Sequence, residues 1–538
     1  MKQHLLALFL FLFALYLLTY SPTLHSSDGL TMFSTAESLA RRGAWDVEQI
    51  RWMGLQQGTY GLDGRLYSRK GVGQPLLALP FTWLGLVIPW FGTVTTTLLL
   101  GSLITALTGG LIFCYLEWLG YRRATALTAG LVYGTGTLAW PYAKTFFSDT
   151  LAGTLLLLAA MFLLAHYRRG RRRDAFAAGL ALAWAVATRY AEAVFLPLFG
   201  LLFAAYLRRR SGGGGPRRAF NPAALAAFAA PIAAVGLSLM AFNLFRYGDP
   251  FNTGYLPQET FSAVWWQGVA GQLFSPGRGL FLYSPALIVA LFGLKAGWRR
   301  RPFETFAALA VIVIHLLLYG KWFMWHGGFA WGPRFMVAAL PFWAVLMAPT
   351  LEAIAARSLP PLIRRGFFVL WGVSVAAQLP GLAVDFDLWQ NRLLQTGLPL
   401  FAPETFFRPV YSPLLGTWQF INPANLDLAW AAGGKINWIL LAALAANLAL
   451  AGVALAAAGR KRPARMWLPV AAAAAIATVI FLLTAAHRAQ PVPLTRALAE
   501  VNRLPDAPLI YNTPEQAIPL AELYAGRAPV LGLIEADA

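Results

Sequence analysis

The chain has 538 residues, of which 58% are hydrophobic and only 12% are charged. A soluble protein carries about twice that share of charged residues, so the composition excludes an ordinary soluble enzyme and indicates a membrane protein. The net charge of +20 does not indicate a nucleic-acid partner, because the basic residues gather in short clusters between apolar runs.

Apolar runs long enough to cross a bilayer as helices recur from the N-terminus onward, without the alternating pattern of a membrane β-barrel. We therefore predict an all-α polytopic membrane protein with about 13 transmembrane helices. The first run is expected to remain as a helix, because Leu24-His25-Ser26 is a poor cleavage site for a signal peptide. The predicted spans are residues 4–20, 95–118, 124–141, 149–167, 174–190, 191–207, 222–243, 280–297, 303–319, 333–350, 366–383, 437–457 and 467–486.

The basic clusters give the expected orientation. Each follows an even number of predicted crossings, so the positive-inside rule places the clusters and the N-terminus in the cytoplasm and the C-terminus outside. This scheme requires residues 74–90 to lie in or dip into the outer interface, and Pro75, Pro80 and Pro89 disfavour a straight crossing there. The alternative is an ordinary crossing at 74–90 with a different run omitted. The clusters are residues 122–123, 168–173, 208–218, 295–301, 357–365 and 460–465.

The expected topology places the working surface outside the cytoplasm, because the long loops all lie there. We divide the chain into a transmembrane domain, residues 1–486, and a small extracytoplasmic segment, residues 487–538. The latter has an α/β pattern and is too small for a large core of its own. The glycine-rich stretch 211–216 is expected to be a flexible cytoplasmic linker. The long outer loops are residues 21–73, 244–279, 320–332 and 384–436.

The first outer loop places an acidic residue near the membrane surface. Asp28 follows the first helix closely, and apolar residues recur at helical spacing from Leu30 to Ala40. This pattern predicts an amphipathic helix over 30–42 that lies along the membrane surface, with Asp28 at its start. A simpler interpretation is that Asp28 or Ser27 only caps this helix.

Further along the same loop, an Asp-Gly turn at 63–64 separates Tyr60 from Tyr67 and predicts a hairpin. The hairpin leads into Arg69 and Lys70, which are followed by glycines. Two cations beside glycine backbone suit the binding of a phosphate. The alternative is contact with anionic lipid headgroups.

Several other charged residues lie at the outer ends of predicted helices: Asp149, Arg189, Glu192 and Arg334. Charged side chains at membrane depth are costly, so they usually mark function or a pairing partner. Asp149 and Arg189 therefore also fit a purely structural ion pair. His315 lies alone in an apolar run and is interpreted as a core residue.

Two outer loops, residues 243–255 and 321–331, are rich in aromatic residues. An interfacial belt accounts for some tryptophan and tyrosine, but not for the glycine, proline, asparagine and arginine among them. Aromatic faces beside polar groups suit sugar rings. The single cysteine, Cys114, and six scattered histidines show neither a disulfide framework nor a zinc motif.

Together these features resemble the GT-C superfamily of integral-membrane glycosyltransferases, in particular the branch of the protein O-mannosyltransferases and the lipid A aminoarabinose transferases. That branch often has an Asp-Glu pair in the first loop and a Lys-Pro-Pro motif, whereas this chain has Gly29 after Asp28 and Pro75 five residues after Lys70. The shared order is Asp28, an amphipathic helix, Tyr67-x-x-Lys70-Gly71-x-Gly73-x-Pro75, Ser148-Asp149 and Arg189, followed by segments 243–255, 274–280 and 331–334.

The resemblance implies a transferase of the cell (inner) membrane that moves a sugar from a polyprenyl-phosphate donor to an envelope acceptor on the extracytoplasmic face. Asp28 would be the general base of an inverting displacement. The residues expected to bind the donor phosphate are Arg69, Lys70, Arg189 and Arg334, with Asp149, Glu192 and Tyr67 in support. No carboxylate cluster requires a metal, although a divalent cation is compatible with the chemistry, and no other cofactor is expected.

Two other functions remain open at this point. A transporter or flippase of lipid-linked saccharides would carry charges within its helices and an alternating-access repeat, and neither is evident. A non-catalytic envelope scaffold would use Asp28 only as a helix cap and would tolerate the loss of every charge named above.

Overall fold

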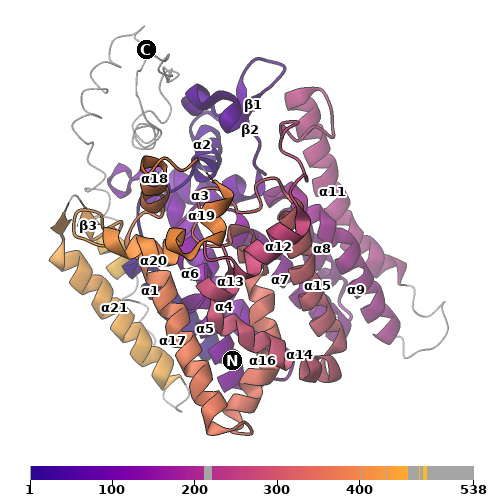
Figure 1. Ribbon diagram of the computed structural model, residues 1–538. Coiled ribbons are helices and arrows are strands. Elements are labelled where there is room, and N and C mark those ends of the chain that lie inside the picture. Colours follow the sequence, from indigo (N-terminus) through magenta and orange to yellow (C-terminus); the bar gives the residue numbers. More distant parts are fainter. Residues whose placement is uncertain are drawn as a thin grey trace.

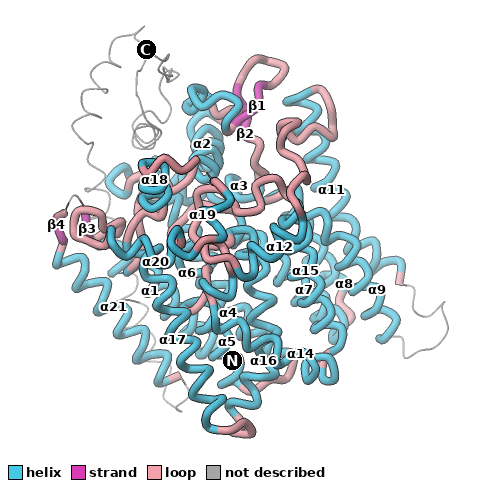
Figure 2. Tube along the Cα trace, viewed as in Figure 1, coloured by secondary structure: helices cyan, strands magenta, loops and turns pink. Residues whose placement is uncertain are grey.

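The computed structural model describes residues 2–210, 221–399, 401–432, 434–458, 472 and 476–481. Long helices form most of this part of the chain, with two small antiparallel sheets near one end of the bundle (Figures 1 and 2). In β1–β2, Thr59 pairs with Tyr67, so the predicted hairpin is confirmed. The predicted linker at 211–216 and the segment 487–538 lie outside the described residues.

The helices are α1 (Lys2–Leu18), α2 (Ser27–Arg42), η1 (Glu48–Gln56), α3 (Gly73–Val87), η2 (Pro89–Phe91), α4 (Thr93–Trp118), α5 (Arg123–Thr135), α6 (Ala139–Tyr142), α7 (Asp149–Arg169), α8 (Arg172–Thr188), η3 (Tyr190–Val194), α9 (Phe195–Arg210), α11 (Pro222–Tyr247), α12 (Trp265–Phe274), α13 (Leu280–Tyr283), η4 (Pro285–Ile288), α14 (Val289–Arg300), α15 (Pro302–Lys321), η5 (Arg334–Ala339), α16 (Leu340–Ala355), α17 (Pro361–Ala383), α18 (Asp387–Gln395), α19 (Pro403–Phe407), η6 (Pro409–Tyr411), α20 (Pro413–Gly416), η7 (Thr417–Phe420) and α21 (Trp438–Ala457). The strands are β1 (Gly58–Tyr60), β2 (Leu66–Ser68), β3 (Ala431–Ala432) and β4 (Lys435–Ile436).

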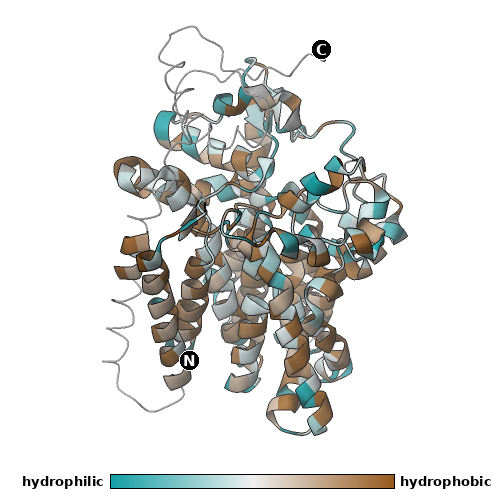
Figure 3. Ribbon diagram, turned by 60° about the vertical axis from the view of Figure 1, so that its left-hand side comes forward, coloured by the Kyte–Doolittle hydropathy of each residue, from teal (hydrophilic) through white to brown (hydrophobic). Residues whose placement is uncertain are grey.

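Within the described ranges, eight helical segments are long and apolar enough to cross a membrane. Hydrophobic residues predominate along the long helices (Figure 3). The multi-pass helical architecture is therefore confirmed, while the count of thirteen crossings stays a prediction. The eight segments are Thr93–Trp118, Asp149–Arg169, Tyr190–Arg210, Pro222–Tyr247, Pro302–Lys321, Arg334–Ala355, Pro361–Ala383 and Trp438–Ala457.

Two predicted spans are not continuous helices. The span at 124–141 breaks after Thr135, where Gly134 and Gly136 weaken the helix, and resumes only as the short α6. The span at 280–297 breaks at Ser284, whose backbone is not helical, because the proline that follows disfavours the helical conformation there. The sequence pattern missed both breaks because the residues on either side are apolar.

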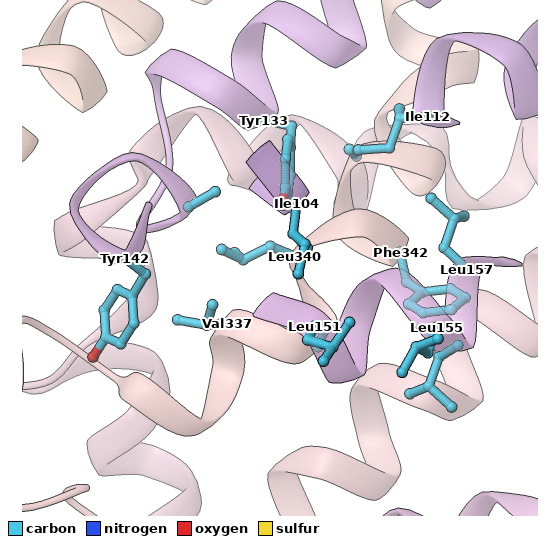
Figure 4. Packing of buried hydrophobic residues seen from close by; sticks show 14 of the residues in the cluster. Ile104, Ile112, Tyr133, Tyr142, Leu151, Leu155, Leu157, Val337, Leu340 and Phe342 are labelled. Carbon is cyan, nitrogen blue, oxygen red and sulfur yellow. The ribbon is translucent and has the colours of Figure 1, made fainter. Parts of the chain in front are cut away.

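The core of the bundle lies around α7, which packs against α4, α8, α16 and η5. Figure 4 shows buried side chains from several helices meeting here, among them Ile104, Leu151, Leu155, Val337 and Phe342. These residues form a closely packed apolar core between α4, α7, η5 and α16.

Among the described residues, the basic residues that follow α4 and end α7 and α14 lie at the opposite end of the bundle from the acidic residues singled out above. Arg168, at the end of α7, donates a hydrogen bond to Trp118 O, and Arg301 donates to Leu119 O at 2.8 Å, so these basic segments meet at one end. Asp149 begins α7, 21 residues long, which puts it about 30 Å away along the helix axis.

Helix α2 forms where predicted but is more deeply buried than a surface helix. Its expected polar face is covered by η1, since Gln49 Nε2 donates to Ser34 O at 2.8 Å and Ser38 Oγ donates to Gln49 at 3.1 Å. The rest of α2 packs on α3. Most of α2 is therefore buried within the protein, whereas the amphipathic pattern predicted a helix lying along the membrane surface.

Candidate active site

Asp28 lies between two cations contributed by distant parts of the chain. Lys70 Nζ is 2.8 Å from Asp28 Oδ1, and the Arg334 guanidinium is 2.7 Å from Asp28 Oδ2. All three side chains are between 12% and 19% exposed, so they are largely but not completely buried. Each carboxylate oxygen of Asp28 is thus held by a different cation.

The ion pairs continue beyond Asp28 as an alternating chain. Arg334 Nε is also 3.2 Å from Asp149 Oδ2, and Arg189 binds the other oxygen of Asp149. Arg189 Nε lies 3.7 Å from Glu192. The three cations and three carboxylates of this cluster have formal charges that sum to zero. Its members are Asp28, Lys70, Asp149, Arg189, Glu192 and Arg334.

Aromatic side chains frame these cations. The Arg334 guanidinium lies 3.8 Å from the ring centre of Phe147, and Arg189 lies 5.0 Å from that of Tyr319, whose hydroxyl accepts a hydrogen bond from Arg189. Tyr319 stacks on Phe335, with ring centres 4.2 Å apart. Such contacts stabilise cations by about 0.5–2 kcal/mol each and fix the planes of the guanidinium groups.

Both central carboxylates belong to the first turn of a helix, where the helix dipole favours a negative charge. The capping residue of α2 is Ser26, whose side chain accepts a hydrogen bond from Gly29 N at 2.9 Å. The interpretation of Asp28 or Ser27 as the cap is therefore wrong. Ser27 instead accepts a hydrogen bond from Gln57 at 2.7 Å.

Three glycines allow the segments of the site to approach one another. A Cβ on Gly71 would lie 2.4 Å from Thr188 O, and one on Gly73 would lie 2.5 Å from Thr188 Oγ1, so the segment after Lys70 packs on the end of α8, next to Arg189. A Cβ on Gly153 would lie 2.4 Å from Ala338 O, one turn below Asp149 and Arg334. Gly71 and Gly73 thus have a packing role. The interpretation from the sequence assigned them only to phosphate binding.

The surroundings of Asp28 control its proton affinity. Burial alone would raise the pKa of this carboxyl, but Lys70 and Arg334 outweigh burial and hold the pKa well below its ordinary value. Burial would lower the pKa of Lys70, but Asp28 outweighs burial and raises it. In the structure both groups are therefore charged at neutral pH, and Asp28 gains proton affinity only when the cations leave it.

The structure brings together Asp28, Lys70, Arg189 and Arg334, with Asp149 and Glu192 adjoining them. It does not bring the two remaining predicted residues to Asp28. Arg69 pairs with Glu259 at 3.1 Å, and the Tyr67 hydroxyl donates to Asp63 at 2.8 Å within the hairpin.

Two further residues join the site that were not selected from the sequence. Tyr319 follows the buried His315 by one helical turn, so both lie on the same face of α15. This spacing is the feature of the sequence that could have identified Tyr319. His315 is buried as predicted, and its Nε2 faces Glu192 at 3.7 Å. Tyr255, from the aromatic loop 243–255, places its ring centre 5.9 Å from Lys70 Nζ.

Helix α2 carries a second buried carboxyl, that of Glu37, and its titration tests whether α2 is buried. Burial raises the pKa of Glu37 from 4.5 to about 7, with Arg41 opposing this shift. The folded state therefore favours protonated Glu37, and the resulting stabilisation is complete below pH 4.5 and is lost as pH rises through about 7. We expect the melting temperature of the wild type, relative to that of Glu37→Gln, to fall between about pH 5 and pH 8.

The exposed Glu404→Gln variant is the control and is expected to follow the wild type at both pH values. A constant difference between the wild type and Glu37→Gln across this pH range would show that α2 is solvated.

Within the described residues, no group of three or more His, Cys, Asp or Glu side chains is placed to hold a metal ion. Asp28 and Asp149 are each held by two cations instead.

No family model matches the sequence, and no curated protein matches it. The fold is similar to that of ArnT from Cupriavidus metallidurans in the apo state, a lipid A aminoarabinose transferase, with a TM-score of 0.51 and 14% identity over 99% of this chain and 85% of that chain. The same protein bound to undecaprenyl phosphate gives a TM-score of 0.47 with 15% identity over 99% and 86%.

The archaeal oligosaccharyltransferase AglB from Archaeoglobus fulgidus, in complex with an inhibitory peptide and a dolichol-phosphate, gives a TM-score of 0.45 with 11% identity over 99% of this chain and 64% of that chain. At these identities the similarity concerns the fold. The resemblance noted from the sequence is confirmed at this level: the chain has a GT-C-like fold.

Proposed function

We propose that the protein is a membrane glycosyltransferase that moves a sugar from a polyprenyl-phosphate donor to an envelope acceptor, with Asp28 as the general base. The observation that carries the proposal is the position of Asp28, which is held between Lys70 and Arg334 at the end of the bundle opposite the basic loops. The basic loops indicate the cytoplasmic side, so the site faces outward, where lipid-linked sugars and envelope acceptors meet.

The donor phosphate fits the cations that now hold Asp28. A phosphodiester offers anionic oxygens to Lys70 and Arg334, and it can displace the carboxylate of Asp28 from both. Because the cluster is neutral without donor, the bound phosphate adds one net negative charge. Released from its cations, Asp28 keeps only the effect of burial, which raises its pKa. Donor binding thus converts Asp28 from an ion-paired carboxylate into a base.

In the proposed transfer step, the proton, the bonds and the charge are all accounted for within the site. Asp28 takes the proton of the acceptor hydroxyl as that oxygen forms a bond to the anomeric carbon. The bond from the anomeric carbon to the phosphate oxygen breaks, and its electron pair leaves with the polyprenyl phosphate. Negative charge moves from Asp28 to the phosphate, and Lys70 and Arg334 stabilise it there. A single displacement of this kind inverts the anomeric centre.

The other members of the cluster position these cations. Asp149 binds Arg189 and Arg334 at once, and Glu192 lies next to Arg189. Arg189 is the third cation within reach of a phosphate that occupies the space beside Arg334. Tyr255, close to Lys70, belongs to the aromatic loop that suits a sugar ring.

The test uses purified protein in lipid vesicles with radiolabelled polyprenyl-phosphate hexoses and pentoses, and envelope membranes as the acceptor source. Transfer of label to a new product, with release of polyprenyl phosphate, supports the proposal. Movement of intact labelled donor across the vesicle bilayer without a covalent product would favour the transporter or flippase instead. Neither transfer nor movement for any donor in the panel would contradict both functions.

A further inference from the structure

A second buried polar cluster lies beside the candidate active site and centres on Asp427. One carboxylate oxygen of Asp427 is 2.5 Å from His25 Nε2 and 2.7 Å from Lys144 Nζ. The other oxygen accepts a hydrogen bond from Ser21 Oγ at 2.5 Å. His25 and Lys144 are buried, at 3% and 1% exposure, so these contacts are shielded from water.

The two partners, His25 and Lys144, belong to the two segments that carry the central carboxylates of the site. His25 precedes Asp28 by three residues, and Lys144 precedes Asp149 by five. These segments also touch directly, because a Cβ on Gly29 would lie 3.5 Å from Phe146 Cβ. A displacement of either segment therefore moves a carboxylate that holds Arg334.

The segment that presents Asp427 is itself well anchored. Asp427 N donates to Ala383 O at the end of α17, and Ala429 N donates to Tyr20 O, at 2.8 and 2.7 Å. Lys144 Nζ makes a further hydrogen bond to Leu382 O at 2.9 Å. The carboxylate thus projects from backbone that is fixed to the outer ends of two long helices.

We infer that Asp427 is a positioning residue for the proposed transfer reaction: by holding His25 and Lys144 with one carboxylate, it fixes Asp28 and Asp149 relative to each other. The inference rests on the proposed function. The inference gives the outer loop 384–436 a part in the reaction, although no described residue of that loop belongs to the ion-pair cluster around Asp28. A carboxylate between two buried partners is suited to this, because its short side chain leaves little freedom.

A positioning role and a purely structural role differ in their response to charge removal. Asp427→Asn leaves Lys144 buried without its counter-charge, which lowers stability whichever role applies. In the double variant Asp427→Leu/Lys144→Met both buried charges are removed, and such replacements often restore stability. The double variant therefore separates the two roles. It removes the uncompensated charge of Lys144 but does not restore the contacts that Asp427 makes with His25 and Lys144.

We expect the double variant to be recovered folded, with a melting temperature closer to that of the wild type than Asp427→Asn, and to have a kcat about 10²-fold lower than the wild type. A misplacement of about 1 Å in a reacting group has an effect of this size. Binding of undecaprenyl phosphate, measured directly as a probe of the cations, is expected to stay within a few-fold because Lys70 and Arg334 are intact. Glu404→Gln, an exposed carboxylate of the same outer loop, is the control and is expected to keep wild-type kcat.

Wild-type kcat in the folded double variant would overturn the inference while leaving the proposed function intact. His25→Leu provides a second measurement if the double variant does not fold. It removes only the partner next to Asp28, so kcat is expected to fall about 10-fold or more with little change in the KM for donor. An unchanged kcat in folded His25→Leu would likewise overturn the inference. Absence of transfer by the wild type would instead contradict the proposed function on which the inference rests.

Discussion

Asp28→Asn is expected to lower kcat for sugar transfer by about 10²–10⁴-fold, the usual contribution of a general base. Asparagine keeps the shape of the side chain but cannot take the proton of the acceptor hydroxyl. It also removes the negative charge that competes with the donor phosphate for Lys70 and Arg334. Binding of undecaprenyl phosphate is therefore expected to become tighter while transfer is lost.

This opposite response separates a catalytic role from a structural one. Both quantities can be measured on one preparation, by transfer of radiolabel and by a thermal-shift titration with undecaprenyl phosphate. Glu404→Gln serves as the matched control for the loss of an outer carboxylate. If folded Asp28→Asn transferred sugar at the wild-type rate, Asp28 would not be the base.

Arg334→Gln is expected to have the second large effect. Arg334 joins Asp28 to Asp149, so its removal leaves the fully buried Asp149 and the largely buried Asp28 with one cation fewer each. Breaking a buried ion pair in this way costs about 3–5 kcal/mol, and we expect a lower melting temperature together with a large rise in the KM for donor. The loss of charge opposite the leaving phosphate also lowers kcat.

Arg334→Lys keeps the charge and is expected to recover only part of the activity. A lysine cannot reach both carboxylates with the fixed fork of a guanidinium, nor stack in the same way on Phe147. Arg408→Gln, an exposed arginine of the outer loop 384–436, is the control. An Arg334→Gln variant with wild-type stability and donor KM would contradict the bridging role.

The helical architecture could be predicted from the sequence because each long helix consists largely of one apolar run, which is a local property. The breaks at Thr135 and Ser284 were missed because glycine and proline within apolar surroundings did not change the overall hydropathy. The burial of α2 was missed for a related reason. Its polar face is satisfied by Gln49 of η1, and a partner of this kind cannot be recognised from periodicity alone.

The six charged members of the cluster could be selected from the sequence because charged residues near helix ends are rare in such a chain. Which of these charged residues pair with one another could not be predicted. Arg69 and Lys70 are adjacent in sequence, but only Lys70 reaches Asp28, while Arg69 pairs with Glu259 from another loop. Asp427 was not selected, since a single carboxylate in a long outer loop gives no local signal of partners about 280 and 400 positions away.

The contact between His25 and Asp427 joins positions 402 residues apart, which sets an order of events during biosynthesis. At about 5–20 residues per second, the ribosome adds Asp427 roughly 20–80 seconds after His25. Arg334 is added before Asp427, so the partner of Asp28 is made first, while His25 and Lys144 lack their shared partner until Asp427 follows. The contact between His25 and Asp427 can therefore form only after most of the chain has been synthesised.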